Sequence, residues 1–193
     1  MLATESRGNG IGRITARVTR EELARGLRAA AYLEGDFVLR SGRRSKYYLD
    51  KYRFETRPDL LGPLGEALAA AVREHEPDAT RLAGPELGAV ALAAATSLQS
   101  GLPFLIVRKA AKDYGTANRL EGVHEEGESV CLIEDVVTSG GAAIDAIQAL
   151  RDVGLRVSTA ICVVDREEGG VDELARHAVR LRPLFLASEL IES

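Results

Sequence analysis

Apolar residues fall into short runs along most of the chain, and longer stretches with helical spacing separate these runs. Short runs rich in Val, Ile, Leu and Phe are typical of buried strands. We expect such strands near residues 81, 104, 130, 157 and 180. Strands that alternate with helices in this way predict an α/β fold with a doubly wound, mainly parallel sheet.

The same pattern predicts the helices. Thr19 and Glu22 form a capping box, which marks the start of a helix. That helix is expected to run to about Tyr32, and Gly35 to end the unit. Further helices are expected over residues 58–74, up to about residue 98, over residues 142–150 and 171–177, and in a short acidic tail.

The N-terminal part has a different pattern. Residues 37–40 and 46–50 are extended stretches joined by a basic, Gly-containing segment, which predicts a hairpin. Residues 1–18 are polar and are expected to form an N-terminal arm. Residues 19–193 are then expected to form a single domain, in which about residues 19–55 make a small hood.

Composition and charge limit the function classes. The chain has 193 residues, of which 46% are hydrophobic and 28% charged, as in ordinary globular proteins. The net charge of −4 argues against nucleic-acid binding through bulk electrostatics. Cys131 and Cys162 lie in apolar runs and are expected to be buried, inert thiols. Because the N-terminus is polar and no long uncharged apolar run occurs, a cytoplasmic protein is expected.

The most informative stretch is residues 130–143. An apolar run over residues 130–133 ends in two acids, Glu134 and Asp135, and a turn of small residues leads into a helix. N–H groups at a helix N-terminus lack intrahelical partners and lie at the positive end of the helix dipole, so this turn is a candidate phosphate site. The neighbouring acids suit hydroxyl groups, a metal or a developing positive charge. A sugar phosphate meets all three requirements.

Residues 134–141 resemble the phosphoribosyl-diphosphate motif of the type I phosphoribosyltransferases. The surrounding sequence, from about residue 19 to the C-terminus, resembles the orotate phosphoribosyltransferases. Residues 39–50 resemble the hood of that family, which covers the base. Arg40 stands where many members carry Lys, and Tyr48 and Leu49 stand where the family holds the orotate ring.

Three more loops after predicted strands carry the resemblance. Residues 108–115 are similar to the catalytic loop of the family, with Tyr114 in place of the usual His. Residues 84–88 match a pyrophosphate-side loop, although Glu86 and Leu87 replace an aromatic–basic pair. Arg166 stands where the family contacts the carboxylate of orotate. Together, the hood, the loop at residues 108–115 and the Asp165-Arg166 pair favour orotate over purine substrates.

The resemblance implies transfer of a phosphoribosyl group from 5-phospho-α-D-ribose 1-diphosphate to orotate, in pyrimidine biosynthesis. It implies that Mg²⁺ is bound mainly through substrate, and that a homodimer shares loop 108–122 across its interface. The implied catalytic residues are Glu134, Asp135, Lys109 and Lys112. The implied diphosphate-sugar site is Arg40, Arg108, Lys109, Lys112, Tyr114, Glu134, Asp135, Val136, Val137, Thr138, Ser139, Gly140, Gly141 and Ala142. The implied orotate site is Tyr48, Leu49, Thr138 and Arg166.

Three alternatives remain open from the sequence. A phosphoribosyltransferase for a purine or another pyrimidine would share the central motif but would need no cation for a base carboxylate. A non-catalytic nucleic-acid-binding regulator could use the same fold, although the acidic pI and the catalytic-type loop argue against it. A phosphoacceptor receiver domain would place its acid pair at the end of the first strand, whereas here the pair comes late.

Overall fold

The computed structural model describes residues 18–38, 42, 44–110 and 119–192. The N-terminal elements are α1 (Arg20–Ala31), β1 (Tyr32–Val38), β2 (Arg44–Leu49), α2 (Tyr52–Glu55) and α3 (Pro58–His75). The middle of the chain forms β3 (Arg81–Pro85), α4 (Gly88–Ser100), β4 (Phe104–Val107), β5 (Leu120–Glu121) and β6 (Ser129–Val137). The last elements are α5 (Gly141–Arg151), β7 (Arg156–Asp165), α6 (Gly170–Arg176), β8 (Arg180–Leu186) and α7 (Ala187–Glu192).

The central sheet confirms the expected fold class. Its strand order is β5-β4-β3-β6-β7-β8, and β5 alone is antiparallel to its neighbour. From β3 the chain moves outward to β4 on one side, and then from β6 to β8 on the other. The strand order therefore reverses between β3 and β6. In open α/β sheets, ligands bind beyond the carboxyl ends of the strands at this switch point.

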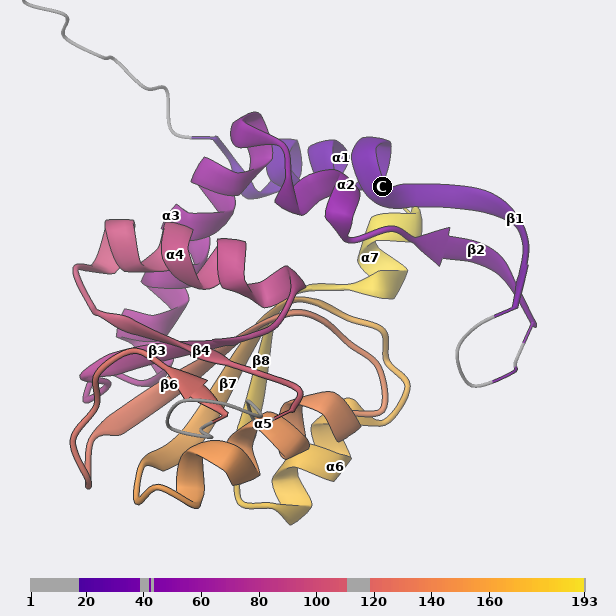
Figure 1. Cartoon of the computed structure of the whole chain (residues 1–193). Coiled ribbons are helices and arrows are strands. Elements are labelled where there is room, and N and C mark those ends of the chain that lie inside the picture. Colours follow the sequence, from indigo (N-terminus) through magenta and orange to yellow (C-terminus); the bar gives the residue numbers. More distant parts are fainter. Residues whose placement is uncertain (1–17, 39–41, 43, 111–118, 193) are drawn as a thin grey trace, which may run out of the picture.

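Helices cover both faces of the sheet (Figure 1), with α3 and α4 on one side and α5 and α6 on the other. The core consequently has two apolar clusters, and the strand residues alternate between them. Cys131 and Ile133 of β6 belong to the cluster that contains α3, whereas Leu132 belongs to the one that contains α5. Cys131 and Cys162 are buried and free, as expected.

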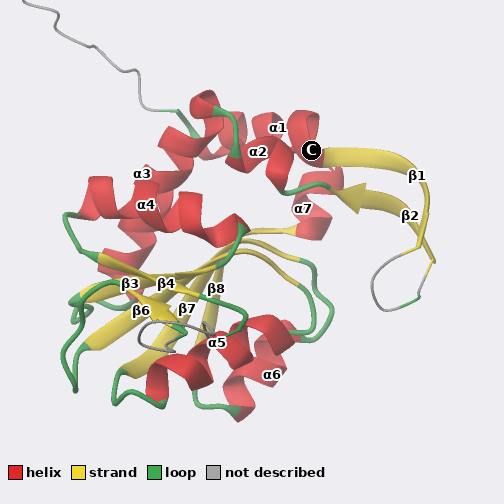
Figure 2. Cartoon of the chain, in the orientation of Figure 1, coloured by secondary structure: helices red, strands yellow, loops and turns green. Residues whose placement is uncertain are grey.

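The N-terminal hairpin projects from the body of the molecule (Figure 2). Strands β1 and β2 pair antiparallel, so the predicted hairpin is confirmed. The first helix has the predicted capping box. It contacts the C-terminal helix, because Arg20 pairs with Glu189 at 2.9 Å and Arg28 donates to the Leu190 carbonyl at 2.8 Å.

Two predicted boundaries are wrong. Gly35 does not end the helical unit but lies within β1, where the register with β2 shifts between Glu34 and Phe37. The central strand does not end before the acids, because β6 continues to Val137 and pairs with β7 along that length. The change from apolar to acidic residues suggested that the strand ends at residue 133. Backbone pairing with β7 instead continues past the two carboxylates.

A buried carboxylate joins the strands at the opposite edge of the sheet. Glu76, which follows α3, accepts hydrogen bonds from Ser158 and Thr159 of β7, each at 2.5 Å. Arg180 of β8 lies 3.5 Å away. Burial alone would raise the pKa of Glu76, but the hydroxyl groups and Arg180 outweigh burial and lower it. This contact ties α3 to β7 and β8 far from the switch point.

We expect Glu76→Ala to lower the free energy of unfolding by about 1–3 kcal/mol, because buried hydroxyl groups lose their acceptor. Chemical denaturation measures the loss. Since the pKa of Glu76 is lowered in the folded state, its contribution is present above the ordinary value near 4.5 and is lost as pH falls through the folded value. Equal stability of wild type and variant at pH 7 would contradict this role.

Candidate active site

A pocket of about 140 Å³ lies at the switch point, between the loop that follows β3 and the loop that follows β6. Its lining combines residues that the sequence predicted with residues that it did not. The lining residues are Lys51, Tyr52, Pro85, Glu86, Leu87, Lys109, Glu134, Asp135, Val136, Val137, Thr138, Gly140, Ala142 and Ala143.

The acid pair lies at the bottom of this pocket. Adjacent residues of a strand point to opposite faces, so Glu134 and Asp135 cover both sides of the end of β6. Asp135 is 3% exposed and receives two hydrogen bonds. Lys51 Nζ donates to its Oδ2 at 2.6 Å, and the N–H of Val136 donates to its Oδ1 at 2.5 Å. Asp135 is therefore an oriented, paired carboxylate.

Other carboxyl groups near Asp135 are less well compensated. Burial, and then the charge of Asp135, raises the pKa of Glu134 above the usual range. Glu55 of α2 is also buried, and the same two causes raise its pKa to about 8. Burial alone would lower the pKa of Lys51, but Asp135 outweighs burial and raises it. Lys51 therefore stays charged beside the acids.

The turn after β6 is open. Gly140 caps α5 with a left-handed φ of 85°, a conformation that glycine adopts without strain. No side chain caps α5, so the first N–H groups of the helix remain available to an anion. Thr138 and Ser139 are exposed, and a Cβ on Gly141 would meet nothing within 4 Å. The acids and this turn face the same pocket.

The basic loop is anchored at its base. The N–H of Arg108 donates to the carbonyl of Arg119 at 2.8 Å, and β5 continues this pairing beside β4. Glu86 accepts the N–H of Lys109 at 2.7 Å and lies 3.9 Å from the Arg108 guanidinium, which also contacts Glu121 at 3.5 Å. The residues that replace the expected aromatic–basic pair thus include a carboxylate that holds the loop.

Arg166 lies under the hairpin. Its side chain is 6% exposed, pairs with Glu168 at 3.2 Å and stacks on the Tyr47 ring at 4.9 Å. Its Nε has no hydrogen-bond partner among the described residues. Tyr48 is 41% exposed and packs on Phe37 instead. A buried guanidinium with an unsatisfied N–H is suited to an anionic ligand group.

The remaining predicted site residues have different placements. Leu49 is buried in the core cluster of α1 and α3. Arg40, Lys112 and Tyr114 lie outside the described residues, so their assignment stays a prediction. Ser139, Gly141, Arg108 and Arg166 are described but do not line the pocket of about 140 Å³.

Sequence reasoning missed four residues near the site, Lys51, Glu55, Tyr47 and Glu86. Lys51 and Glu55 are separated from Asp135 by about 80 residues, and no local pattern signals that contact. The hairpin itself was predicted, but the sequence did not show which of its faces turns inward.

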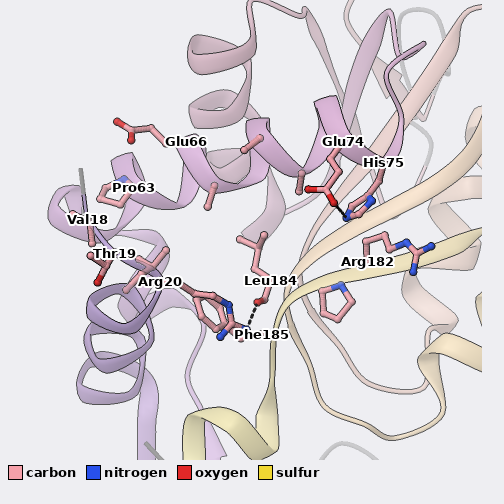
Figure 3. Close-up of a pocket in the computed structure, with 15 residues that line it drawn as sticks. Val18, Thr19, Arg20, Pro63, Glu66, Glu74, His75, Arg182, Leu184 and Phe185 are labelled. Atoms are coloured by element: carbon pink, nitrogen blue, oxygen red, sulfur yellow. Dashed lines mark hydrogen bonds and ion pairs between the residues drawn. The ribbon is translucent and has the colours of Figure 1, made fainter. Parts of the chain in front are cut away.

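A larger pocket of about 390 Å³ lies elsewhere, between α1, α3 and β8 (Figure 3). Arg20 reaches into it, donates to the Leu184 carbonyl at 3.0 Å and lies over the Phe185 ring. It shares no lining residue with the switch-point pocket, and none of the predicted site residues lines it. The candidate active site is therefore the smaller pocket, where the acids and the open helix terminus meet.

No group of three or more His, Cys, Asp or Glu side chains suited to a metal ion occurs within residues 18–110 and 119–192, as far as these are described. No helix in the described part of the chain is long and apolar enough to span a membrane.

Comparisons with known proteins agree with this geometry. The sequence matches no protein-family model. Over 174 residues it is 48% identical to the orotate phosphoribosyltransferase of Halobacterium salinarum, covering 90% of this chain and 97% of the relative. The crystal structure of orotate phosphoribosyltransferase from Aeropyrum pernix superposes with a TM-score of 0.78 at 34% identity, covering 88% of this chain and 96% of that one.

The Mycobacterium tuberculosis enzyme in complex with 5-phospho-alpha-D-ribosyl 1-diphosphate superposes with a TM-score of 0.75 at 28% identity, covering 89% of this chain and 98% of that one. The 48% identity to the Halobacterium salinarum relative, over most of both chains, is high enough to decide the family. The chain belongs to the orotate phosphoribosyltransferase family.

Proposed function

We propose that this protein joins orotate to 5-phospho-α-D-ribose 1-diphosphate, giving orotidine 5′-monophosphate and pyrophosphate. The observation that carries the proposal is the pocket in which Glu134 and Asp135 lie beside the uncapped N-terminus of α5. The two acids would accept hydrogen bonds from the ribose hydroxyls. The N–H groups over residues 138–142 would bind the 5′-phosphate. Hydroxyl and phosphoryl ends of one ligand thus match two adjacent parts of one pocket.

Breaking the bond between C1 and the diphosphate leaves positive charge on the ribose ring and negative charge on the leaving group. The negative field of Asp135, together with Glu134 where it is ionised, would stabilise the first charge. Arg108 and Lys109, at the base of the loop after β4, would bind the second, together with the predicted Lys112. Preorganisation supports this role, because Glu86 already holds the backbone of Lys109.

Orotate would bind under the hairpin. Its carboxylate would pair with Arg166, whose Nε lacks a partner in the described structure. The Tyr47 ring covers the same guanidinium and limits its movement. Tyr48, Leu49 and Thr138 would contribute through the backbone or at the edge of the base site. A purine has no carboxylate to satisfy Arg166, so this residue favours orotate.

Further features complete the proposal. Mg²⁺ would be bound mainly through diphosphate and hydroxyl oxygens of the substrate, as the family resemblance implies. When bound, the ion neutralises part of the charge of the leaving group. The enzyme would act as a cytoplasmic homodimer in which loop 108–122 reaches the partner, as the family resemblance implies.

The direct test mixes the purified protein with the diphosphate sugar, Mg²⁺ and one base at a time. Absorbance should fall with orotate and should stay constant with adenine, hypoxanthine, guanine and uracil. Turnover with a purine in place of orotate would support the rival phosphoribosyltransferase. Salt-dependent RNA binding without turnover of any base would support the regulator instead.

Arg166→Ala should raise the KM for orotate by roughly 10- to 100-fold, because a charge-assisted pair contributes about 1.5–3 kcal/mol. The KM for the diphosphate sugar should change by less than about threefold, since Arg166 does not line the acid pocket. Initial rates at varied concentrations of each substrate separate the two effects. Unchanged orotate kinetics would show that the base site lies elsewhere.

Gly88→Ala tests the acid pocket, because a Cβ at Gly88 would collide with the Asp135 carboxylate and crowd Glu55. Displacement of Asp135 should weaken diphosphate-sugar binding roughly 100-fold, measured by calorimetry. Gly62→Ala is the matched control, since its Cβ meets nothing within 4 Å and Gly62 is also helical. Wild-type affinity in a folded Gly88→Ala variant would contradict the role of Asp135.

A further inference from the structure

The carboxyl groups at the acid pocket carry more negative charge than Lys51 alone can balance. Three buried carboxyl groups, those of Glu55, Glu134 and Asp135, gather around Lys51 Nζ. Burying an ionised carboxyl group without a partner is costly, and the usual outcome is that one group keeps its proton. The question is which carboxyl group is protonated and what this does for the site.

The geometry makes Glu55 the carboxyl group that can share a proton with Asp135. Its carboxyl group and that of Asp135 meet over the Cα of Gly88, where an ideal Cβ would lie 2.8 and 2.9 Å from the two Glu55 oxygens. Glu55 Oε1 has no hydrogen-bond partner among the described residues. Lys51 Nζ donates to Asp135 at 2.6 Å and acts on Glu55 through its charge, so the short hydrogen bond from Lys51 goes to Asp135. A shared proton would satisfy both carboxyl groups.

The charges around Glu55 act in the same direction. Asp135 and Glu134 face it from β6, and Asp50 lies in the segment that precedes α2. Among the groups that shift the pKa of Glu55, Lys51 acts in the opposite direction and lowers it. From α4, the group against Glu55 is the backbone of Gly88. After burial, Asp135 is the largest cause of the raised pKa of Glu55, through its charge and through a hydrogen bond that only a protonated carboxyl group can donate.

We propose that Glu55 is a positioning residue that keeps its proton at neutral pH and donates it in a hydrogen bond to Asp135. Asp135 is then held by three donors, the Glu55 hydroxyl, Lys51 Nζ and the Val136 N–H. Its orientation toward the ribose is fixed before the sugar arrives. Ionised Glu55 would repel Asp135 and draw Lys51 away. This inference rests on the proposed function only for the identity of the sugar.

The test compares wild type with Glu55→Gln, which keeps the shape and a donor but cannot ionise. Affinity for the diphosphate sugar, with Mg²⁺ and without orotate, is measured by calorimetry from pH 7 to 9.5. Wild type should lose about tenfold in affinity for each pH unit above about 8, whereas Glu55→Gln should lose much less. Glu66→Gln, an exposed Glu of α3, is the control and should follow wild type.

A second readout needs no ligand. Because the pKa of Glu55 is raised from 4.5 to about 8, its contribution to stability is present at low pH and is lost as pH rises through the folded value. The difference in Tm, variant minus wild type, should therefore grow between about pH 5 and 8 and then level off. Carboxyl ¹³C shifts of wild type give the same pKa without a substitution.

The results distinguish failure of this inference from failure of the proposed function. An equal loss of affinity at every pH in Glu55→Gln, together with a Tm difference independent of pH, would overturn the inference and leave a merely structural Glu55. Absence of sugar binding by wild type would overturn the proposed function, while the Tm series and the ¹³C shifts would still decide where the proton lies.

Discussion

The ion pair between Lys51 and Asp135 is the contact on which the rest of the site depends. Lys51 follows the hairpin and Asp135 lies near the end of β6, so one charge pair joins the hood to the sheet. A carboxylate that is 3% exposed needs such a partner, because burial without one costs several kcal/mol. The same pair therefore orients the acid for its ligand and ties the segment after the hairpin to the sheet.

Topology explains why this contact forms where it does. The strand order reverses between β3 and β6, so the loops at their carboxyl ends diverge and leave a pocket. The loop after β3 leads into Gly88 at the start of α4, and the missing Cβ of Gly88 leaves room for Asp135 and Glu55. The loop after β6 brings the uncapped start of α5. One side of the pocket therefore makes room for the acids, and the other provides N–H groups for an anion.

Local signals were enough to predict the parallel sheet, the capping box of α1 and the sequence strand–turn–helix around residues 130–143. The apolar runs and glycine positions that define these elements act over a few residues. The end of β6 was misjudged because its pairing with β7 continues through Glu134 and Asp135. Gly35 was misjudged because a glycine in a strand bulge resembles a glycine after a helix.

Long-range contacts could not be predicted from the sequence. Lys51 looks like an ordinary charge beside a strand, and its role appears only when the fold brings it to Asp135. Glu86 replaces a family residue, and only the fold shows that it holds the backbone of Lys109. The inward face of the hairpin was also undetermined, and it presents Tyr47, rather than Tyr48, to Arg166.

The central claim is a division of labour at one edge of the sheet, with the acids for the ribose hydroxyls and the open turn for the phosphate. A crystal structure of the protein with the diphosphate sugar and Mg²⁺ tests it most directly. The account predicts the 5′-phosphate on the N–H groups of residues 138–142 and the ribose hydroxyls on Glu134 and Asp135. A ligand whose diphosphate occupies that turn, with both acids facing water, would contradict it.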